Sequence, residues 1–356
     1  MERIVDYAGL FPPATLPLAE ALRNYAEYRR GPRSWVLGRF ICPATRLAEI
    51  EAHASLLADG EPWSFSVLGR GGADADAFIG GLIEDLSLVA GFLDGHGDRV
   101  GVDALEVRMP PPSTWGAGHR DVLNLLTRTA EAIERGSRQA VCPFLEVPLE
   151  PPASNGSPGA WAGDSADTPV DRILPAIAEH NRRWRGLQCG PLGAKVRTGG
   201  VTADQFPSID QVAHWITRCV GEGVVFKATA GLHHPFRRYC DQVGTRMHGF
   251  VNLIMASALA GRARPDGTDR DGASRDGGDR GDDDSSTARG LPEGMVQAVL
   301  ADELPASFSL DGQSLGWRQF RVAIEDLRAA RRERAIAFGS CSFTEPIEDL
   351  EAAGWL

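Results

Sequence analysis

The chain contains very little lysine, because only Lys195 and Lys227 among its 37 Lys and Arg residues are lysines. It also lacks a basic excess, since 48 Asp and Glu residues give a formal net charge of -11. A surface that binds nucleic-acid phosphates needs the opposite balance, so we expect no nucleic-acid partner. No apolar run approaches the roughly 20 residues that cross a bilayer, so we expect no membrane partner.

Paired cysteines and a leader sequence are missing as well. The six cysteines are scattered without a C-x-x-C pair, which argues against a zinc motif and against a disulfide framework. The N-terminal MERIVDYAGLFPPATLPLAE lacks the charged-then-apolar pattern of a secretory signal. These features predict a cytoplasmic protein with reduced thiols and with no metal or other cofactor, and they leave open a homo-oligomer.

The chain does contain a regular alternation of short apolar runs and longer amphipathic stretches. Eight such repeats predict an α/β fold, the (β/α)8 or TIM barrel. A doubly wound sheet would instead need a Gly-rich turn after the first strand, where Arg39-Phe40-Ile41-Cys42-Pro43 stands. The predicted strands are Trp35–Cys42, Trp63–Leu68, Ala104–Met109, Val141–Val147, Leu192–Arg197, Val224–Thr229, Ser307–Asp311 and Ala335–Ser340.

We expect a single barrel domain over residues 1–356, with three segments outside the repeat. Residues 1–33 form a proline-flanked lead and a helix. Residues 151–168 are a flexible loop rich in Pro, Gly and Ser. Residues 262–289 contain no Val, Ile, Leu, Met or aromatic residue, which predicts a disordered insertion rich in Asp, Arg and Gly. The alternation resumes after each insertion, so neither marks a domain boundary.

Charged residues gather at the C-terminal ends of the predicted strands, where barrels of this type carry their function. Side chains alternate along a strand, so residues two apart share a face. A buried ion network that only stabilises the barrel is the alternative, but burying so many charges is costly. The residues that we expect in the barrel mouth are Glu106, Arg108, Glu146, Lys195, Arg197, Lys227 and Thr229.

Two lysines in a chain that otherwise uses arginine indicate a need for amine chemistry. An amine can lose its proton near neutral pH and form an imine with a carbonyl, which a guanidinium cannot do. Two neighbouring lysines lower each other's pKa, and partial burial adds to this effect. We therefore expect Lys227 to form the imine and Lys195 to lower its pKa. Glu146 or Glu106 would transfer protons.

The loops after the strands extend this candidate site toward an anionic substrate. Gly339-Ser340-Cys341-Ser342 leads into a helix N-terminus, whose free N–H groups suit an anion. The adjacent histidines fit a substrate contact or a proton shuttle better than a metal site, because they lack metal-ligand spacing. A nucleophilic role for Cys341 is the less favoured interpretation, because the sequence indicates no histidine partner for it. The candidate substrate-binding residues are Arg108, Arg197, Gly199, Gly200, Thr229, His233, His234, Ser340, Cys341 and Ser342.

The nine residues GVVFKATAG, at 223–231, resemble the Schiff-base strand of the deoxyribose-phosphate aldolase family. That family has Gly, two residues and Phe before the lysine, and small and hydroxyl residues and a Gly after it. The resemblance implies that Lys227 is the imine-forming lysine, on the sixth strand. The family's second lysine lies on the seventh strand, where Ser307–Asp311 has none, and its fourth-strand aspartate would be Glu146. The longer strings FKATAGLHHP and FGSCSF are similar to those of uncharacterised bacterial proteins, which implies a TIM-barrel family without a known activity.

The sequence therefore predicts a lyase of the class I aldolase type that acts on a small anionic carbonyl compound, phosphorylated or not. Two other functions stay open. One is a sugar-phosphate isomerase or phosphoribosyl-transfer barrel that binds phosphate through Lys and Arg and uses Glu as base or metal ligand. The other is a non-catalytic barrel that binds a metabolite or a protein partner. Metal-dependent turnover without an imine would favour the first, and ligand binding that survives Lys→Arg changes would favour the second.

Overall fold

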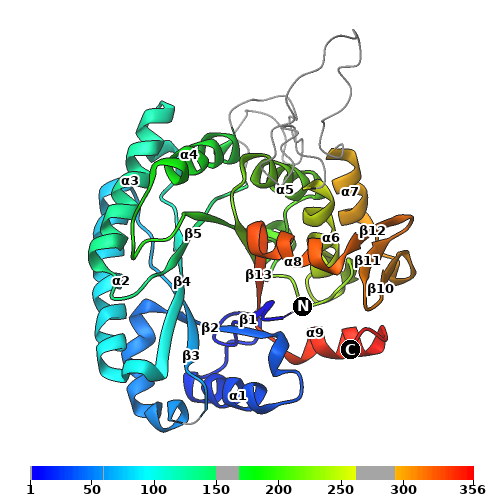
Figure 1. Cartoon of the computed structure of the whole chain (residues 1–356), viewed down its shortest axis with the longest axis horizontal. Coiled ribbons are helices and arrows are strands. Elements are labelled where there is room, and N and C mark those ends of the chain that lie inside the picture. Colours follow the sequence, from blue (N-terminus) through cyan, green and yellow to red (C-terminus); the bar gives the residue numbers. More distant parts are fainter. Residues whose placement is uncertain (1, 59, 150–167, 262–292) are drawn as a thin grey trace, which may run out of the picture.

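Eight parallel strands close into a barrel, which confirms the predicted (β/α)8 fold (Figure 1). The computed structural model describes residues 2–58, 60–149, 168–261 and 293–356. The predicted loop at 151–168 and insertion at 262–289 thus lie outside the described residues, apart from Thr168. In chain order the barrel strands are β1 (Val5–Tyr7), β2 (Leu37–Pro43), β3 (Trp63–Leu68), β4 (Val100–Arg108), β5 (Cys142–Glu146), β6 (Gly193–Arg197), β7 (Phe226–Thr229) and β13 (Ala335–Ser340).

Helices surround the barrel because each has one apolar face to bury against the strands. In α3, for example, Val122, Leu125, Leu126 and Ile133 are buried, at the spacing that one side of a helix requires. Between β2 and β3 a 3₁₀ stretch, Ala44–Leu57, takes the helix position. The helices are α1 (Leu18–Arg30), α2 (Ala75–His96), α3 (His119–Gly136), α4 (Pro169–Arg183), α5 (Ile209–Glu222), α6 (Phe250–Ala260), α7 (Glu293–Ala301), α8 (Ile324–Glu333) and α9 (Thr344–Ala352).

The predicted number of strands is right, but one predicted member is wrong. The segment Ser307–Asp311 does not join the barrel: it contains β10 (Phe308–Leu310), which pairs antiparallel with β11 (Ser314–Trp317) in a small sheet completed by β12 (Phe320–Ala323). The strand that completes the eight is β1, which pairs in parallel with β13 and β2, while β7 pairs directly with β13. The three residues of β1 include an aspartate, a type depleted in strands, so the segment gives little strand signal.

This correction moves the position number of the charged strands by one. With β1 as the first barrel strand, Glu106 lies on the fourth, Lys195 on the sixth and Lys227 on the seventh. The expected position of Lys227 on the sixth strand is therefore wrong. Lys195 and Lys227 lie on neighbouring strands and are direct partners in the register of β6 and β7.

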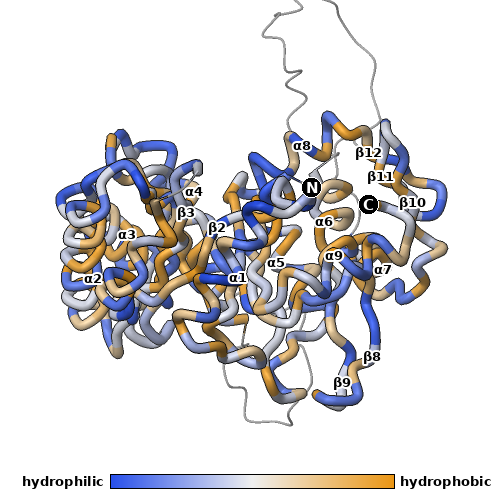
Figure 2. Tube along the Cα trace, turned by 90° about the horizontal axis from the view of Figure 1, so that it is seen from below, coloured by the Kyte–Doolittle hydropathy of each residue, from blue (hydrophilic) through white to orange (hydrophobic). Residues whose placement is uncertain are grey.

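The connection between β7 and β13 is the longest and most elaborated of the barrel. It carries a two-stranded hairpin of β8 (Arg238–Cys240) and β9 (Thr245–Met247), then α6, α7, the small sheet and α8. Figure 2 shows that this hairpin projects from the barrel and is mostly hydrophilic. All of α6 is buried. No helix of the described residues is both long and apolar enough to cross a bilayer.

Candidate active site

The interior of the barrel holds two lysines that share one carboxylate. Lys227 Nζ lies 2.6 Å from Glu106 Oε1 and 2.5 Å from Asp6 Oδ2. Lys195 Nζ lies 2.8 Å from Glu106 Oε2 and 3.0 Å from Glu146 Oε2. Glu106 thus binds one lysine with each oxygen. The four residues predicted to carry chemistry do meet in one cluster, to which the structure adds Asp6.

Parallel register explains why these side chains face one another. Glu146 is the direct neighbour of Lys195 across β5 and β6, and Lys195 is that of Lys227 across β6 and β7. Register partners in a sheet point to the same face, which is here the barrel interior. Glu106 enters from β4 and Asp6 from β1, on opposite sides of the lysine strands.

Two more polar residues anchor the carboxylates of the cluster. Ser66 Oγ donates a hydrogen bond of 2.6 Å to Glu106 Oε1 and accepts one of 3.3 Å from Lys227 Nζ. The Arg39 backbone N–H donates to Asp6 Oδ1 at 2.7 Å, and the Arg39 Nη1 atom lies 3.6 Å from Asp6 Oδ2. The sequence analysis missed Asp6, Ser66 and Arg39. The sequence offered one indication of the cluster, which is the charged residue Asp6 inside the otherwise apolar run Ile4–Tyr7.

The charges of the cluster balance. Because a buried ion is stable only with a partner, the cluster is best described as a chain of alternating signs rather than as a pair of crowded cations. Its members, in order of contact, are Arg39, Asp6, Lys227, Glu106, Lys195 and Glu146.

This balance sets the protonation states of Glu106 and Lys195. Burial on its own would raise the pKa of Glu106, but Lys195 and Lys227 outweigh it and hold that pKa well below its usual range. Burial on its own would lower the pKa of Lys195, but Glu106 and Glu146 outweigh it and raise that pKa. The prediction that the neighbouring cation lowers the pKa of Lys195 is therefore wrong. Lys195 is an ammonium in the ligand-free barrel.

The two lysines differ in how close they lie to solvent. The Lys227 side chain is 0% exposed, whereas the side chain of Lys195 is 5% exposed and that of Glu146 is 13% exposed. Arg197, two residues beyond Lys195 on β6, is exposed, as is Arg108 at the end of β4. Exposure therefore rises from Lys227 through Lys195 and Glu146 to the arginines, and this order defines the direction of the barrel mouth.

The predicted histidines and Cys341 form a second cluster at the ends of β7 and β13. His233 Nδ1 lies 2.9 Å from Glu345 Oε2, and His233 Nε2 lies 3.8 Å from Cys341 Sγ. His234 Nδ1 lies 2.6 Å from Asp349 Oδ2. The expectation that Cys341 has no histidine partner is therefore wrong. His233 is distant from Cys341 in the sequence, so the sequence alone did not reveal the contact. Burial raises the pKa of the Cys341 thiol, which disfavours a thiolate.

The helix N-terminus expected to bind an anion is already compensated by its own residues. Ser342 Oγ accepts a hydrogen bond of 3.2 Å from the Glu345 N–H, and Ser340 Oγ accepts one of 3.3 Å from the Ser342 N–H. The Glu345 carboxylate itself stands in the first turn of α9. An acidic side chain at this position satisfies the helix dipole and opposes a second anion.

The predicted glycines and Thr229 serve the local backbone. A Cβ atom on Gly199 would lie 2.5 Å from the Phe206 ring, and one on Gly200 would meet the side chain of Gln205. Close packing within the loop after β6 therefore explains both glycines. Thr229 Oγ1 donates to the Val196 carbonyl at 3.4 Å and so ties β7 to β6.

A cleft lies beside this second cluster, and the described residues show no evident metal centre. The cleft has a volume of about 370 Å³, and its lining includes His234, Arg237, Arg238, Glu303 and Asp349 but neither lysine. Within the described ranges, no three His, Cys, Asp or Glu side chains converge as metal ligands would. Comparison of the chain with known family models and with curated proteins found no match.

Proposed function

We propose that the protein is a lyase of the class I aldolase type, in which Lys195 forms an imine with a small carbonyl compound. The observation that carries this proposal is the pair of interior lysines that share Glu106. Imine chemistry needs an amine beside groups that move protons and stabilise the cationic intermediate, and this cluster supplies both. The balanced charges would serve a structural network equally well, so the lysine chemistry must be tested directly.

The exposure of the two lysines favours Lys195 as the nucleophile in place of Lys227. A carbonyl compound must reach the amine, and the Lys227 side chain is fully enclosed between Asp6 and Glu106. Lys195 has Glu146 on its mouth side, and the Glu146 side chain is itself partly exposed. A ligand that displaces Glu146 would reach Lys195 first.

Strand positions support the same assignment. In the deoxyribose-phosphate aldolase family, which the Lys227 strand resembles, the imine-forming lysine lies on the sixth strand and a second lysine on the seventh. Lys195 and Lys227 occupy those two positions once β1 is counted. The fourth strand, where the family carries an aspartate, holds Glu106. The strand positions thus match Lys195, and not Lys227 as the nine-residue resemblance implies, to the imine-forming lysine of that family.

The two glutamates would take different parts in the reaction. Glu146, 3.0 Å from Lys195 Nζ, accepts a proton from the ammonium, and the free amine attacks the carbonyl carbon. Proton return from Glu146 lets the carbonyl oxygen leave as water and gives the protonated imine. Glu146, ionised again, then accepts the proton of the β-hydroxyl group. The bond between the α and β carbons breaks, an aldehyde is released, and the electron pair of that bond passes into the imine to give an enamine. Return of the proton from Glu146 to the α carbon and hydrolysis of the imine by water free Lys195. Glu106 stays ionised because of its low pKa, so it stabilises the cations.

Reductive trapping tests this proposal. The protein is treated with cyanoborohydride and a panel of small aldehydes and oxo acids, and adducts are located by intact mass and peptide mapping. We expect one adduct on Lys195, its loss in Lys195→Arg, and slower formation in Lys227→Arg. The matched Lys→Arg changes keep the positive charge, so they isolate the amine. An adduct confined to Lys227 would reassign the nucleophile, and the absence of any lysine adduct would overturn the proposal.

A further inference from the structure

Two arginines at the barrel mouth have no protein partner. Arg108 ends β4 and Arg197 ends β6, and both are exposed. Across the part of the chain that the structure describes, neither side chain makes an ion pair or a hydrogen bond. Arg39 at the other side of the cluster, by contrast, is paired with Asp6.

Register puts the two arginines on the strands to either side of Glu146, which contacts Lys195. Arg108 is the direct neighbour of Glu146 across β4 and β5. Arg197 follows Lys195 by two residues, so both side chains belong to the same face of β6, with their Cα atoms about 6.6 Å apart at the usual rise of a strand. The Arg197 side chain thus originates one layer nearer to the mouth than Lys195, and the Arg108 side chain originates in the same register row as Glu146 and Lys195.

The positive charges of Arg108 and Arg197 are in excess, because the charges of the buried cluster below them already balance. The buried chain from Arg39 to Glu146 contains three cations and three carboxylates, so it leaves no negative charge to neutralise the mouth. A planar guanidinium binds a carboxylate or a phosphate through two parallel hydrogen bonds. Two unpaired guanidinium groups therefore match a ligand that carries two negative charges.

The opposite side of the rim carries acidic side chains. The residues that end β13 and begin α9 present the carboxylates of Glu345 and Asp349, each already paired with a histidine. From this contrast we propose that Arg108 and Arg197 form a dianion subsite over β4 and β6. The inference rests on the proposed imine chemistry for its substrate class, which is a short carbonyl compound that bears a phosphate monoester or two carboxylates.

Matched carbonyl probes test the subsite on the full chain. Dihydroxyacetone is compared with its phosphate, and 2-oxobutanoate with 2-oxoglutarate, in cyanoborohydride trapping at Lys195. In at least one pair, we expect the more highly charged probe to reach half-maximal trapping at a concentration at least about tenfold lower than the less charged probe does. A preference for the phosphate identifies a phosphate monoester substrate, and a preference for 2-oxoglutarate identifies a dicarboxylate. Equal trapping within both pairs would overturn the subsite.

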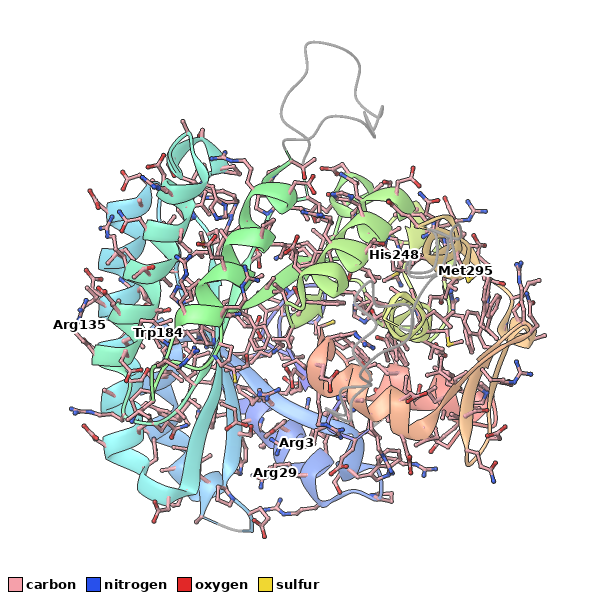
Figure 3. The ribbon with its side chains drawn as sticks, turned by 45° about the horizontal axis from the view of Figure 1, so that its top comes forward. Arg3, Arg29, Arg135, Trp184, His248 and Met295 are labelled. Atoms are coloured by element: carbon pink, nitrogen blue, oxygen red, sulfur yellow. The ribbon has the colours of Figure 1, made fainter. Side chains whose placement is uncertain are left out.

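Arginine variants assign the effect to the two residues. Arg108→Gln and Arg197→Gln should each bring the ratio between the more charged and the less charged probe of a pair close to one. The control is Arg135→Gln, on the outside of the barrel in α3, where Arg135 pairs with Glu131 (Figure 3). This control should keep the wild-type ratio. A preference that survives both mouth variants would place the anion elsewhere and reject the inference.

Direct binding separates this inference from the proposed function. Inorganic phosphate and succinate are titrated calorimetrically into the wild-type protein and into the Arg108→Gln and Arg197→Gln variants. Dianion binding that the arginine variants lose, without any lysine adduct in the trapping experiment, would support the subsite and reject the imine. Lysine trapping with dianion binding that the variants leave unchanged would support the imine and reject the subsite.

Discussion

The two clusters of ionisable residues use similar side chains in different surroundings. In the barrel interior, Glu106 serves two lysines and every partner is buried or nearly so. At the rim, His233 and His234 each pair with one carboxylate of α9, and the side chains of Glu345 and Asp349 are 50% and 33% exposed. Water can replace a lost partner at the rim but not in the interior. The comparison teaches that the loss of one partner leaves an unsolvated charge only where solvent is excluded.

The largest expected effect comes from removing the shared carboxylate. Glu106→Gln leaves both lysines with one partner fewer inside the barrel, and breaking a buried ion pair costs about 3–5 kcal/mol of unfolding free energy. Urea unfolding measures the change, and loss of the folded state in buffer counts as the large effect. Glu345→Gln is the matched control and should cost less than about 1 kcal/mol, as exposed pairs do. Equal costs for the two variants would remove the distinction between the clusters.

A fall in pH should also lower the unfolding free energy through the interior cluster more than through the rim cluster. The pKa of Glu106 is lowered in the fold, so its ionised form contributes stability that is complete above the ordinary value of 4.5 and is lost as the pH falls toward the lowered pKa. We expect the unfolding free energy of the wild type to fall below pH 4.5 by up to about 1.4 kcal/mol per pH unit from this group. Glu106→Gln should show a shallower decline in chemical denaturation, and Glu345→Gln should follow the wild type. Parallel curves for all three would contradict the assignment.

Base should act on the imine reaction through Lys195. Its pKa is raised by Glu106 and Glu146 despite burial, so the free amine becomes more abundant as the pH rises toward that value. We expect the single-turnover trapping rate to increase by about tenfold per pH unit between about pH 8 and 10. Glu146→Gln removes one of the raising charges and should shift the profile to lower pH, whatever it does to the maximal rate. A rate that is independent of pH in this range would show that the ammonium does not limit imine formation.

The sequence allowed the barrel and its four central side chains to be predicted, but not the way they pair. Alternation of apolar and amphipathic stretches is a local property, so it identified seven of the eight barrel strands. It failed at β1, where three residues including Asp6 form a strand only because β13 and β2 lie on either side. That one error shifted the strand positions of both lysines.

Long-range contacts account for the remaining errors. The partners Asp6 and Lys227 are far apart in the chain, as are His233 and Cys341, so no spacing rule could reveal either contact. The expected low pKa of Lys195 failed for the same reason. Register alone suggested two adjacent cations, whereas Glu106 enters from β4, two strands away from β6, and reverses the electrostatic effect. Pair geometry in a closed barrel depends on which strands face each other across the interior.

The smallest expected effect tests whether the rim behaves as an exposed cluster throughout. Asp349→Asn removes the charge that pairs with His234, at a contact whose two side chains are 20% and 33% exposed. Solvent and salt screen such a pair, so the unfolding free energy should change by less than about 1 kcal/mol, and the change should shrink further in high salt. Urea unfolding at low and high ionic strength measures both quantities. A loss of unfolding free energy that is as large as that of Glu106→Gln and insensitive to salt would contradict this expectation. It would mean that a desolvated network holds α9, as one holds the barrel interior. The contrast between the two clusters would then rest on charge balance rather than on exposure.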